Sequence, residues 1–113
     1  MEPMDFKFVK IVVFVPSSHA DAVRKALGES GCGHIGNYDY CSVSMKVVGR
    51  FRGLDGSKPF IGQAGELEKV EEEKIETICP SGKLDDVLAA IKAAHPYEEP
   101  AVDVYPLLNG GQL

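Results

Sequence analysis

The sequence lacks the features that mark membrane-spanning, secreted and nucleic-acid-binding proteins. Its longest apolar run, residues 11–15, falls far short of the ~18 residues expected of a membrane span, and its first residues do not have the pattern of a signal peptide. Bases number 12 against 17 acids, for a net charge of −5, and no cluster of bases exceeds a pair. We therefore expect neither a membrane nor a nucleic acid as partner.

Cysteine is also scarce. Cys32, Cys41 and Cys79 lie far apart and form no CxxC pair, so they do not indicate a disulfide framework. We expect free thiols and a cytoplasmic protein. The serines stand in no GxSxG motif, and no cysteine has an adjacent histidine that could activate it, so nothing indicates nucleophilic catalysis.

The composition is that of one folded domain. The chain has 113 residues, of which 44% are hydrophobic. A chain of this length buries roughly two-thirds of its unfolded surface, which is enough for one core. We expect a single domain over residues 1–113, with a core over about 5–107 and a tail at 108–113.

Apolar residues at helical spacing predict two helices, near residues 18–30 and 82–95. Ser18 and Asp21 resemble a capping box at the start of the first helix. Pro96 should end the second, because proline disfavours helical geometry in the residue before it.

Strands are predicted where apolar residues alternate or run continuously, over residues 6–15, 39–51 and 101–107. Residues 66–79 are ambiguous. Their Glu-rich half favours a helix, whereas Ile75, Thr77 and Cys79 alternate as in a strand.

If residues 66–79 form a strand, the element order is β-α-β-β-α-β, the ferredoxin-like α+β arrangement. Right-handed crossovers then place both helices on one face of a four-stranded antiparallel sheet. The first strand is central in this topology and is apolar on both faces, with Phe6, Phe8, Val12 and Phe14 on one and Val9, Ile11, Val13 and Val15 on the other. Self-association is the economical cover for the face without helices.

Residues 49–65 form a glycine-rich segment that is long for a passive connection. Arg50, Arg52 and Lys58, together with backbone N–H groups, could hold an anion such as a nucleotide phosphate or a carboxylate. No Walker-type motif specifies phosphate. Alternatively, the segment is a solvated loop whose apolar residues pack against the sheet.

His95, Tyr97, Glu98 and Glu99 form the densest polar group of the chain. A histidine near two carboxylates could act as an acid/base pair, join a metal site or border a pocket between subunits. The alternative is structural: His95 caps the helix C-terminus, where a partly positive imidazole meets the negative end of the dipole.

Cys32, His34 and Cys41 could offer soft ligands to zinc or copper, but no CxxC motif supports them. Alternatively, glycines shape the helix exit here and Cys41 packs in the core. Structural hydrogen bonds are then the role of the neighbouring polar residues, Asn37, Tyr38 and Tyr40.

Three segments resemble a known family: GHIGNYDYCS at 33–42, GRFRGLDGSKPFIGQAGELEKVEEEKIETI at 49–78 and HPYEEPAVDVYPL at 95–107. In this order and spacing they resemble the inserted domain of the Ngg-one-interacting-factor-three-like proteins, over nearly the whole chain to residue 107. The HPYEEP segment also resembles the HPYE-x-P motif of the divalent-cation-tolerance (CutA) family.

The resemblance implies a PII/CutA-like ferredoxin fold, a homotrimer and a strand at residues 66–79, whose charges would suit an exposed strand that resists unwanted pairing. Full-length relatives carry a two-metal site in flanking domains outside the region of resemblance, so no cofactor or metal ligand is implied. His34, Cys41 and His95 remain the metal candidates. The family motifs place a set of residues at a possible ligand cleft: His34, Asn37, Tyr38, Tyr40, Cys41, Arg50, Arg52, His95, Tyr97, Glu98 and Pro100.

We therefore expect a homotrimeric PII-like binding or regulatory domain without catalytic activity of its own. The alternatives are a divalent metal-ion (copper or zinc) binding protein and an accessory subunit of a separately encoded metal-dependent hydrolase. A domain of this size leaves little room for a private pocket. Any ligand is thus expected at a subunit boundary, in contact with residues 49–65 of one chain and residues 95–100 of the same or a neighbouring chain.

Overall fold

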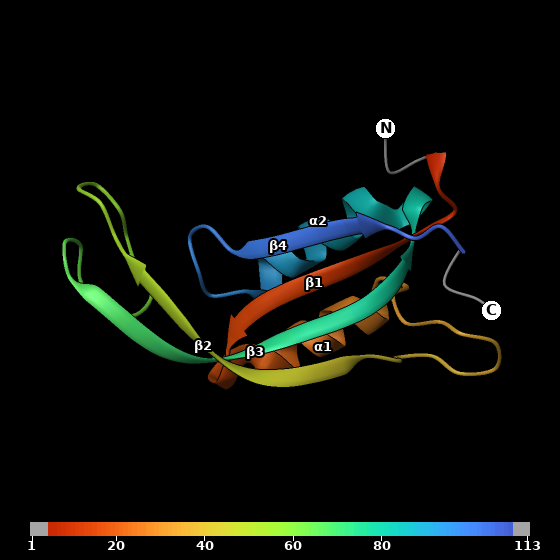
Figure 1. Cartoon of the computed structure of the whole chain (residues 1–113), viewed down its shortest axis with the longest axis horizontal. Helices are drawn as coiled ribbons and strands as arrows, with labels where there is room; N and C mark the ends of the chain where they lie inside the picture. Colours follow the sequence, from red (N-terminus) through yellow and green to blue (C-terminus); the bar gives the residue numbers. More distant parts are fainter. Residues whose placement is uncertain (1–4, 110–113) are drawn as a thin grey trace.

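The computed structural model describes residues 5–109 and shows a four-stranded antiparallel sheet with two helices on one face (Figure 1). The elements in chain order are β1 (Phe8–Pro16), α1 (Ala20–Glu29), β2 (Val43–Arg52), β3 (Leu67–Pro80), α2 (Leu84–Ala94) and β4 (Ala101–Pro106). The strand order in the sheet is β2-β3-β1-β4. The predicted ferredoxin-like order is confirmed, and residues 66–79 are strand. Most of the tail predicted at 108–113 lies outside the described residues.

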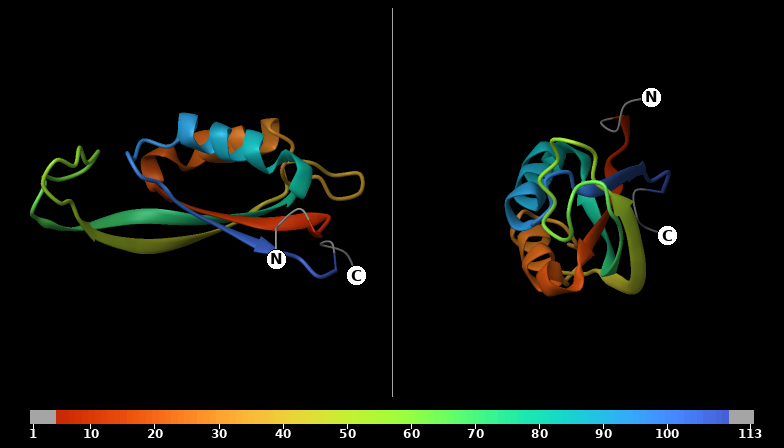
Figure 2. Two further views of the ribbon diagram at one scale, coloured as in Figure 1. Left: turned by 90° about the horizontal axis from the view of Figure 1, so that it is seen from above. Right: turned by 90° about the vertical axis from the view of Figure 1, so that its left-hand side faces the viewer.

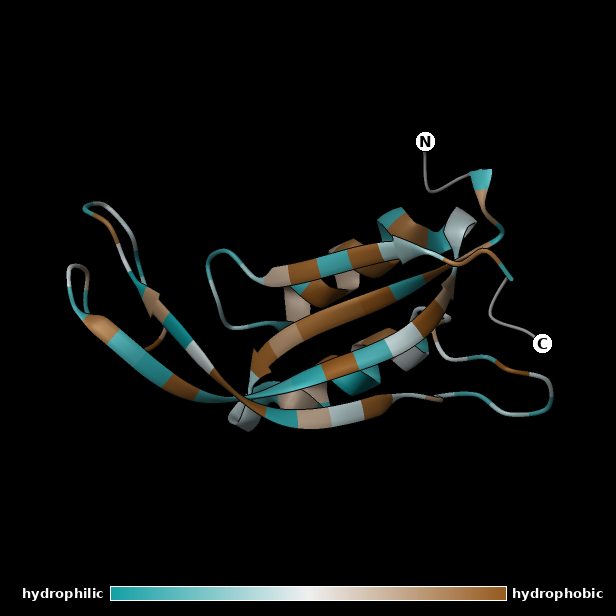
Figure 3. Ribbon diagram, in the orientation of Figure 1, coloured by the Kyte–Doolittle hydropathy of each residue, from teal (hydrophilic) through white to brown (hydrophobic). Residues whose placement is uncertain are grey.

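β1 occupies the interior of the sheet because its sequence is apolar on both sides. It pairs with β3 along its whole length and with β4 from Val9 to Phe14. The side chains of Val9, Ile11, Val13 and Val15 point toward the helices and are fully buried. The hydropathy colouring of Figure 3 shows β1 as the most continuously hydrophobic strand.

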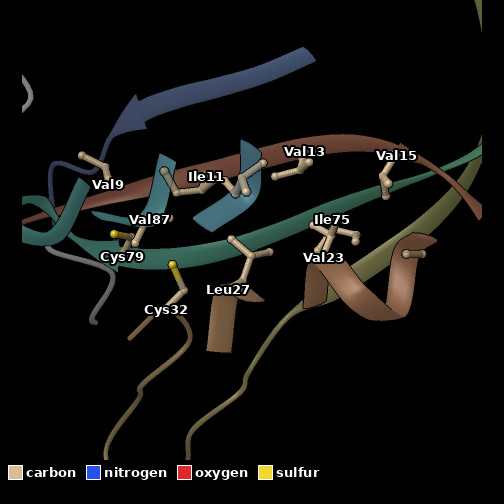
Figure 4. Close-up of a cluster of buried hydrophobic side chains, with 12 residues drawn as sticks. Val9, Ile11, Val13, Val15, Val23, Leu27, Cys32, Ile75, Cys79 and Val87 are labelled. Carbon is tan, nitrogen blue, oxygen red and sulfur yellow. The ribbon is translucent and has the colours of Figure 1, made fainter. Parts of the chain in front are cut away.

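The two helices lie side by side over the same face of the sheet (Figure 2). α1 buries Ala20, Val23 and Leu27, and α2 buries Val87 and Ile91. This spacing of three or four residues directs one stripe of each helix at the sheet. Figure 4 shows the resulting core. No helix within residues 5–109 is long and apolar enough to cross a membrane.

The start of α1 differs from the predicted capping box. A 3₁₀ turn precedes the helix, so His19 is the N-cap, and no side-chain hydrogen bond caps it. Ser18 Oγ instead lies 2.8 Å from His19 Nδ1, and Asp21 forms a 2.6 Å salt bridge with Arg24. Arg24 also reaches Glu73 of β3 at 2.6 Å. Ser18 and Asp21 therefore bond to neighbours in the turn and the helix instead of capping it, and Arg24 ties the helix to the sheet.

The second strand begins at Val43 rather than at residue 39 as predicted. Tyr40 has a positive φ of 56°, which interrupts an extended chain. The N–H of Cys41 donates to the carbonyl of Gly33 at 3.0 Å, and the hydroxyl of Thr77 donates to the carbonyl of Cys41 at 2.7 Å. These hydrogen bonds replace the regular hydrogen bonds between strands that an uninterrupted strand would make at residue 41.

β2 and β3 extend beyond the rest of the sheet. β3 pairs with β1 only from Glu72 to Pro80, but it pairs with β2 from Leu67 to Glu76. We call residues 48–52 and 67–71 the arm, and residues 53–66, which fold back at its end, the tip loop (Figures 1 and 2). β3 is thus an inner strand from Glu72 to Glu76, whereas among the described residues its arm half pairs with β2 alone. The charged residues of that half, such as Glu68, Lys69 and Glu71, therefore lie at an edge of the sheet, in keeping with the expectation of an exposed strand.

The buried side of β3 switches within the strand. From residue 73 to 79 the buried residues are odd-numbered and lie beneath the helices, as Ile75 does. From residue 68 to 72 the buried residues are the even-numbered Val70 and Glu72. Because alternate side chains point to opposite faces, the arm buries the face that the helices leave bare. In β2, residues 47, 49 and 51 are half-buried in the same way.

No helix of the described chain covers the second face of the central sheet (Figure 2). The register places Val43, Met45 and Tyr105 on this face, and about half of each or more is exposed. Phe14 also lies on it, with Lys74 Nζ 5.9 Å from the centre of its ring. We call this surface the bare face.

Candidate ligand cavity

The arm, the tip loop and the connection between α2 and β4 enclose a cavity of about 560 Å³. Such a volume is typical of small-molecule sites. Residues 49–65 and 95–100 meet within one chain, because the arm projects and its loop folds back. The expectation that a single chain has little room for a pocket of its own is therefore wrong. The cavity is lined by Phe14, Gly49, Arg50, Phe51, Arg52, Gly53, Ser57, Pro59, Phe60, Glu72, Tyr97, Glu98, Glu99 and Ala101.

His95 anchors the turn of residues 95–100 to the sheet. Its Nε2 lies 2.7 Å from the carbonyl oxygen of Phe14, and its Nδ1 accepts the N–H of Tyr97 at 3.1 Å, so Nε2 carries the proton. Burial lowers the pKa of His95, although the bond to Phe14 opposes this. His95 is the C-cap residue of α2 as predicted, but its imidazole is neutral and points to the sheet instead of the helix end. Half-buried Pro100 then leads into β4.

Tyr97 and Glu72 join the turn to the arm. The Tyr97 hydroxyl donates to Glu72 Oε2 at 2.9 Å, and Glu72 is only 7% exposed. A Cβ at position 49 would overlap Glu72 Oε1, so Gly49 leaves the space that the carboxylate occupies. Burial, and then the bond to Glu72, raise the pKa of Tyr97. Tyr97 therefore remains a hydrogen-bond donor at neutral pH.

The tip loop closes over this pair. The backbone N–H of Lys58 donates to Glu98 Oε2 at 2.9 Å. The ring of Phe60 lies 6.4 Å from that of Tyr97 and 5.3 Å from that of His19, centre to centre. Among residues 5–109, one hydrogen bond and two ring contacts join the tip loop to this turn and to His19, and so few contacts allow the loop to respond to a ligand.

Arg50 and Arg52 line the cavity, but they lie on the face of β2 opposite its floor. They alternate with Gly49 and Phe51 in a register with β3 that stays regular through Arg52. Gly49 and Phe51 share the face of Glu72, so the arginines lie on the opposite, exposed face. The cavity floor therefore carries a carboxylate and aromatic rings.

The segment of residues 33–42 lies at the other end of the sheet. The N–H of Gly33 donates to the carbonyl of Ile78 at 2.8 Å, whereas the cavity begins at Phe14 and Glu72. The structure thus brings His95, Tyr97 and Glu98 to the arm but leaves the 33–42 residues apart from them. Five predicted residues lie in this exposed or half-exposed segment: His34, Asn37, Tyr38, Tyr40 and Cys41.

Within residues 5–109 no three His, Cys, Asp or Glu side chains are placed to hold a metal ion. Cys32 does not face His34 or Cys41, because its thiol is buried against Cys79 (Figure 4). The hydrogen bond with Cys79, together with burial, raises the pKa of Cys32. Cys41 is half-exposed rather than in the core.

Sequence reasoning placed Tyr97 at the site but missed Glu72, Gly49 and the rings of Phe51 and Phe60. Glu72 stands among several glutamates, and nothing local separates it from exposed Glu71. One signal could have found Glu72. The apolar Val70 is even-numbered, whereas the apolar residues from Ile75 onward are odd-numbered, so the two halves of the strand bury opposite faces.

Comparison with known proteins gives relatives in sequence and in fold. No protein-family model matches the chain. A GTP cyclohydrolase 1 type 2 homolog of Halalkalibacterium halodurans is 56% identical over 103 residues, which cover 91% of this chain and 28% of the relative. Its counterpart in Bacillus subtilis is 48% identical over 98 residues, which cover 87% and 26%. The chain thus spans roughly a quarter of the length of these relatives.

Among solved structures, a Bacillus cereus protein related to NIF3, the Ngg-one-interacting-factor-three family, superposes with a TM-score of 0.79 at 50% identity, over 92% of this chain and 26% of that one. The resemblance to the NIF3-like family is confirmed. CutA from Archaeoglobus fulgidus matches with a TM-score of 0.65 at 20% identity, over 89% and 84% of the two chains. The PII-like CutA of Nostoc gives 0.67 at 17%, over 93% and 86%. These matches confirm the PII/CutA-like fold of the NIF3-like domain.

Proposed function

We propose that this NIF3-like domain is a binding module that assembles as a homotrimer in the cytoplasm, takes a small ligand in the cavity and has no catalytic activity of its own. The observation that carries the proposal is the cavity itself. Its two walls are joined by the Tyr97–Glu72 and Lys58–Glu98 bonds. A ligand in contact with both walls would change how the tip loop is held, which is a regulatory output.

The bare face supports self-association. Val43, Met45 and Tyr105 are exposed on it, and burying such apolar surface favours association. Phe14 and Ala101 belong both to this face and to the cavity lining. A second copy packed there would border the cavity, so that ligand binding and assembly are coupled.

Sedimentation equilibrium tests the assembly. We expect a mass near three times the 12.2 kDa of the chain. Met45→Glu should shift it toward the monomer, while Ala22→Glu, on an exposed position of α1, should leave it unchanged. A wild-type mass of 12.2 kDa at micromolar concentration contradicts the trimer.

A thermal-shift screen against nucleotides, metal ions and small carboxylates and amines tests ligand binding, because a ligand that binds only the native state raises its apparent stability. The purified domain should show no hydrolase activity. Turnover that a chelator abolishes would contradict the absence of catalysis.

A second candidate is that the domain acts as an accessory to a metal-dependent hydrolase. It is favoured because the chain matches about one quarter of the length of relatives that are named GTP cyclohydrolase 1 type 2 homolog. The test is to add the purified domain to a protein that carries the other three quarters of such a relative. A change in turnover of GTP supports this candidate, and unchanged turnover without co-sedimentation counts against it.

A further inference from the structure

We infer that the cavity selects an organic cation that carries N–H donors on a flat apolar body, and that Glu72 is the residue that recognises the charge. The inference rests on the ligand cavity proposed above and narrows its ligand to one chemical class. It reverses the anionic ligand suggested by the arginines of residues 49–65.

Glu72 is a buried carboxylate with unused capacity to accept hydrogen bonds. Tyr97 donates to Oε2, while Oε1 lies over Gly49 at the cavity floor. No salt bridge among the described residues involves Glu72. Burial of a carboxylate is costly unless a charged partner compensates it. A cationic N–H donor in the cavity would supply that partner at Oε1.

The walls suit the apolar body of such a cation. The rings of Phe51 and Phe60 lie 6.0 and 6.4 Å from the ring of Tyr97, centre to centre, and all three line the cavity. Aromatic faces attract cations and stack on flat groups. The same chemistry is already visible at the edge of the cavity, where Lys74 lies over the ring of Phe14.

Other ligand classes fit the floor less well. An anion at the floor would meet Glu72, with Glu98 and Glu99 nearby, because strand alternation places Arg50 and Arg52 on the face opposite Glu72. A divalent metal ion needs several oxygen ligands converging on one point, and residues 5–109 contain no such group.

Three isosteric probes test the charge preference by calorimetry on the wild-type protein: benzamidinium, benzamide and benzoate. They share a flat ring and differ in charge. We expect benzamidinium to bind at millimolar concentration, benzamide to bind at least tenfold more weakly, and benzoate not to bind. This order needs no variant, so it stays testable if a substitution prevents folding.

Glu72→Gln identifies the residue. It keeps the shape and removes the charge, and we expect about a tenfold loss of benzamidinium affinity with little change for benzamide, since hydrogen bonds to charged groups are the stronger ones. Glu71→Gln is the matched control, because Glu71 is the next residue but is exposed on the opposite face.

Tighter binding of benzoate than of benzamidinium, no binding of benzamidinium, or equal losses in Glu72→Gln and Glu71→Gln would each overturn the inference. A different ligand found by the thermal-shift screen would then leave the proposed binding role standing. A monomer that nothing in that screen stabilises would overturn the binding role itself.

Discussion

The two halves of β3 differ in which face is buried and in what buries it. In residues 73–79 the side chains beneath the helices are buried, and Ile75 is fully enclosed. In residues 67–72 the opposite face is buried, against the tip loop and the turn of residues 95–100. Glu72 and Glu73 are neighbours at the switch. Glu73 bonds Arg24 on the helix side, whereas Glu72 accepts from Tyr97 on the other.

β3 is therefore one continuous strand whose two halves pack against different parts of the molecule. The hydrogen-bonded pairing of β3 with β1 and with β2 continues through the point where the buried face changes, because neither register shifts there. The helix-covered half derives its stability from apolar packing, and the arm half from a few polar bonds and ring contacts. This difference predicts that the arm opens more easily than the core, which suits a ligand-binding segment.

The largest expected effect is at Ile75. Ile75→Ala should lower the free energy of unfolding by about 2–5 kcal/mol, because it leaves a cavity in the helix-covered core. Val70→Ala, in the arm, should cost less than about 2 kcal/mol, since fewer buried atoms are removed. Urea denaturation measures both. Equal losses would contradict the proposed difference between the halves.

Tyr97→Phe should have the next largest effect. It leaves the buried Glu72 carboxylate without the Tyr97 donor, at a cost of about 1–3 kcal/mol. Hydrogen exchange of amides in the tip loop should accelerate, while exchange in α1 stays unchanged. Tyr105→Phe, at a half-exposed tyrosine, is the control and should change neither. Faster exchange throughout the molecule would mean that the arm does not open independently.

The effect of pH on stability through the titration of His95 should be smaller than the effect of Tyr97→Phe. Its folded-state pKa lies below the ordinary 6.5, so the unfolded chain takes up the proton first as the pH falls. The stability contribution is therefore complete above pH 6.5 and is lost as the pH falls from there toward the folded-state pKa. His95→Gln, which can make both hydrogen bonds without titrating, should flatten the stability curve in this range. Parallel curves for the two proteins would show that His95 is not the titrating group.

The smallest effects should come from the two carboxylates that Arg24 binds. Glu73→Gln, at a partly buried pair, should cost roughly 1 kcal/mol or less. Asp21→Asn should be indistinguishable from wild type, because the Asp21 side chain is 99% exposed. Thermal unfolding of both variants checks the order, and a larger loss for Asp21→Asn would reverse it.

Much of the fold could be predicted from the residues. The two-sided hydrophobicity of β1 placed it inside the sheet, and apolar spacing located both helices to within a few residues. The predicted capping box at Ser18 is wrong, because a 3₁₀ turn precedes the helix. The predicted start of the second strand at residue 39 is too early, because Tyr40 adopts a positive φ. Such local geometries depend on contacts that the pattern of residue types does not contain.

The candidate site could be predicted in part. The segments at 49–65 and 95–100 were correctly expected to meet, but the roles of their residues were not. Arg50 and Arg52 were expected at the site because of their charge, and they do line the cavity, but strand alternation places them on the face opposite Glu72. Glu72 was hidden among similar residues, because its distinct environment comes from Gly49 and Tyr97, which are far from it in sequence.

By themselves, the residue patterns determined both helices and three of the four strands, because periodicity and propensity are local properties that each segment carries with it. The strand at residues 66–79 was implied only by the family resemblance, since its own pattern left helix and strand open. Only the tertiary structure decided which face of the arm is buried, where the cavity lies and which carboxylate is enclosed in it. The physical reason is that burial of a side chain depends on what packs against it. Here that partner is a loop which folds back over the strand and a turn that arrives from the other edge of the sheet.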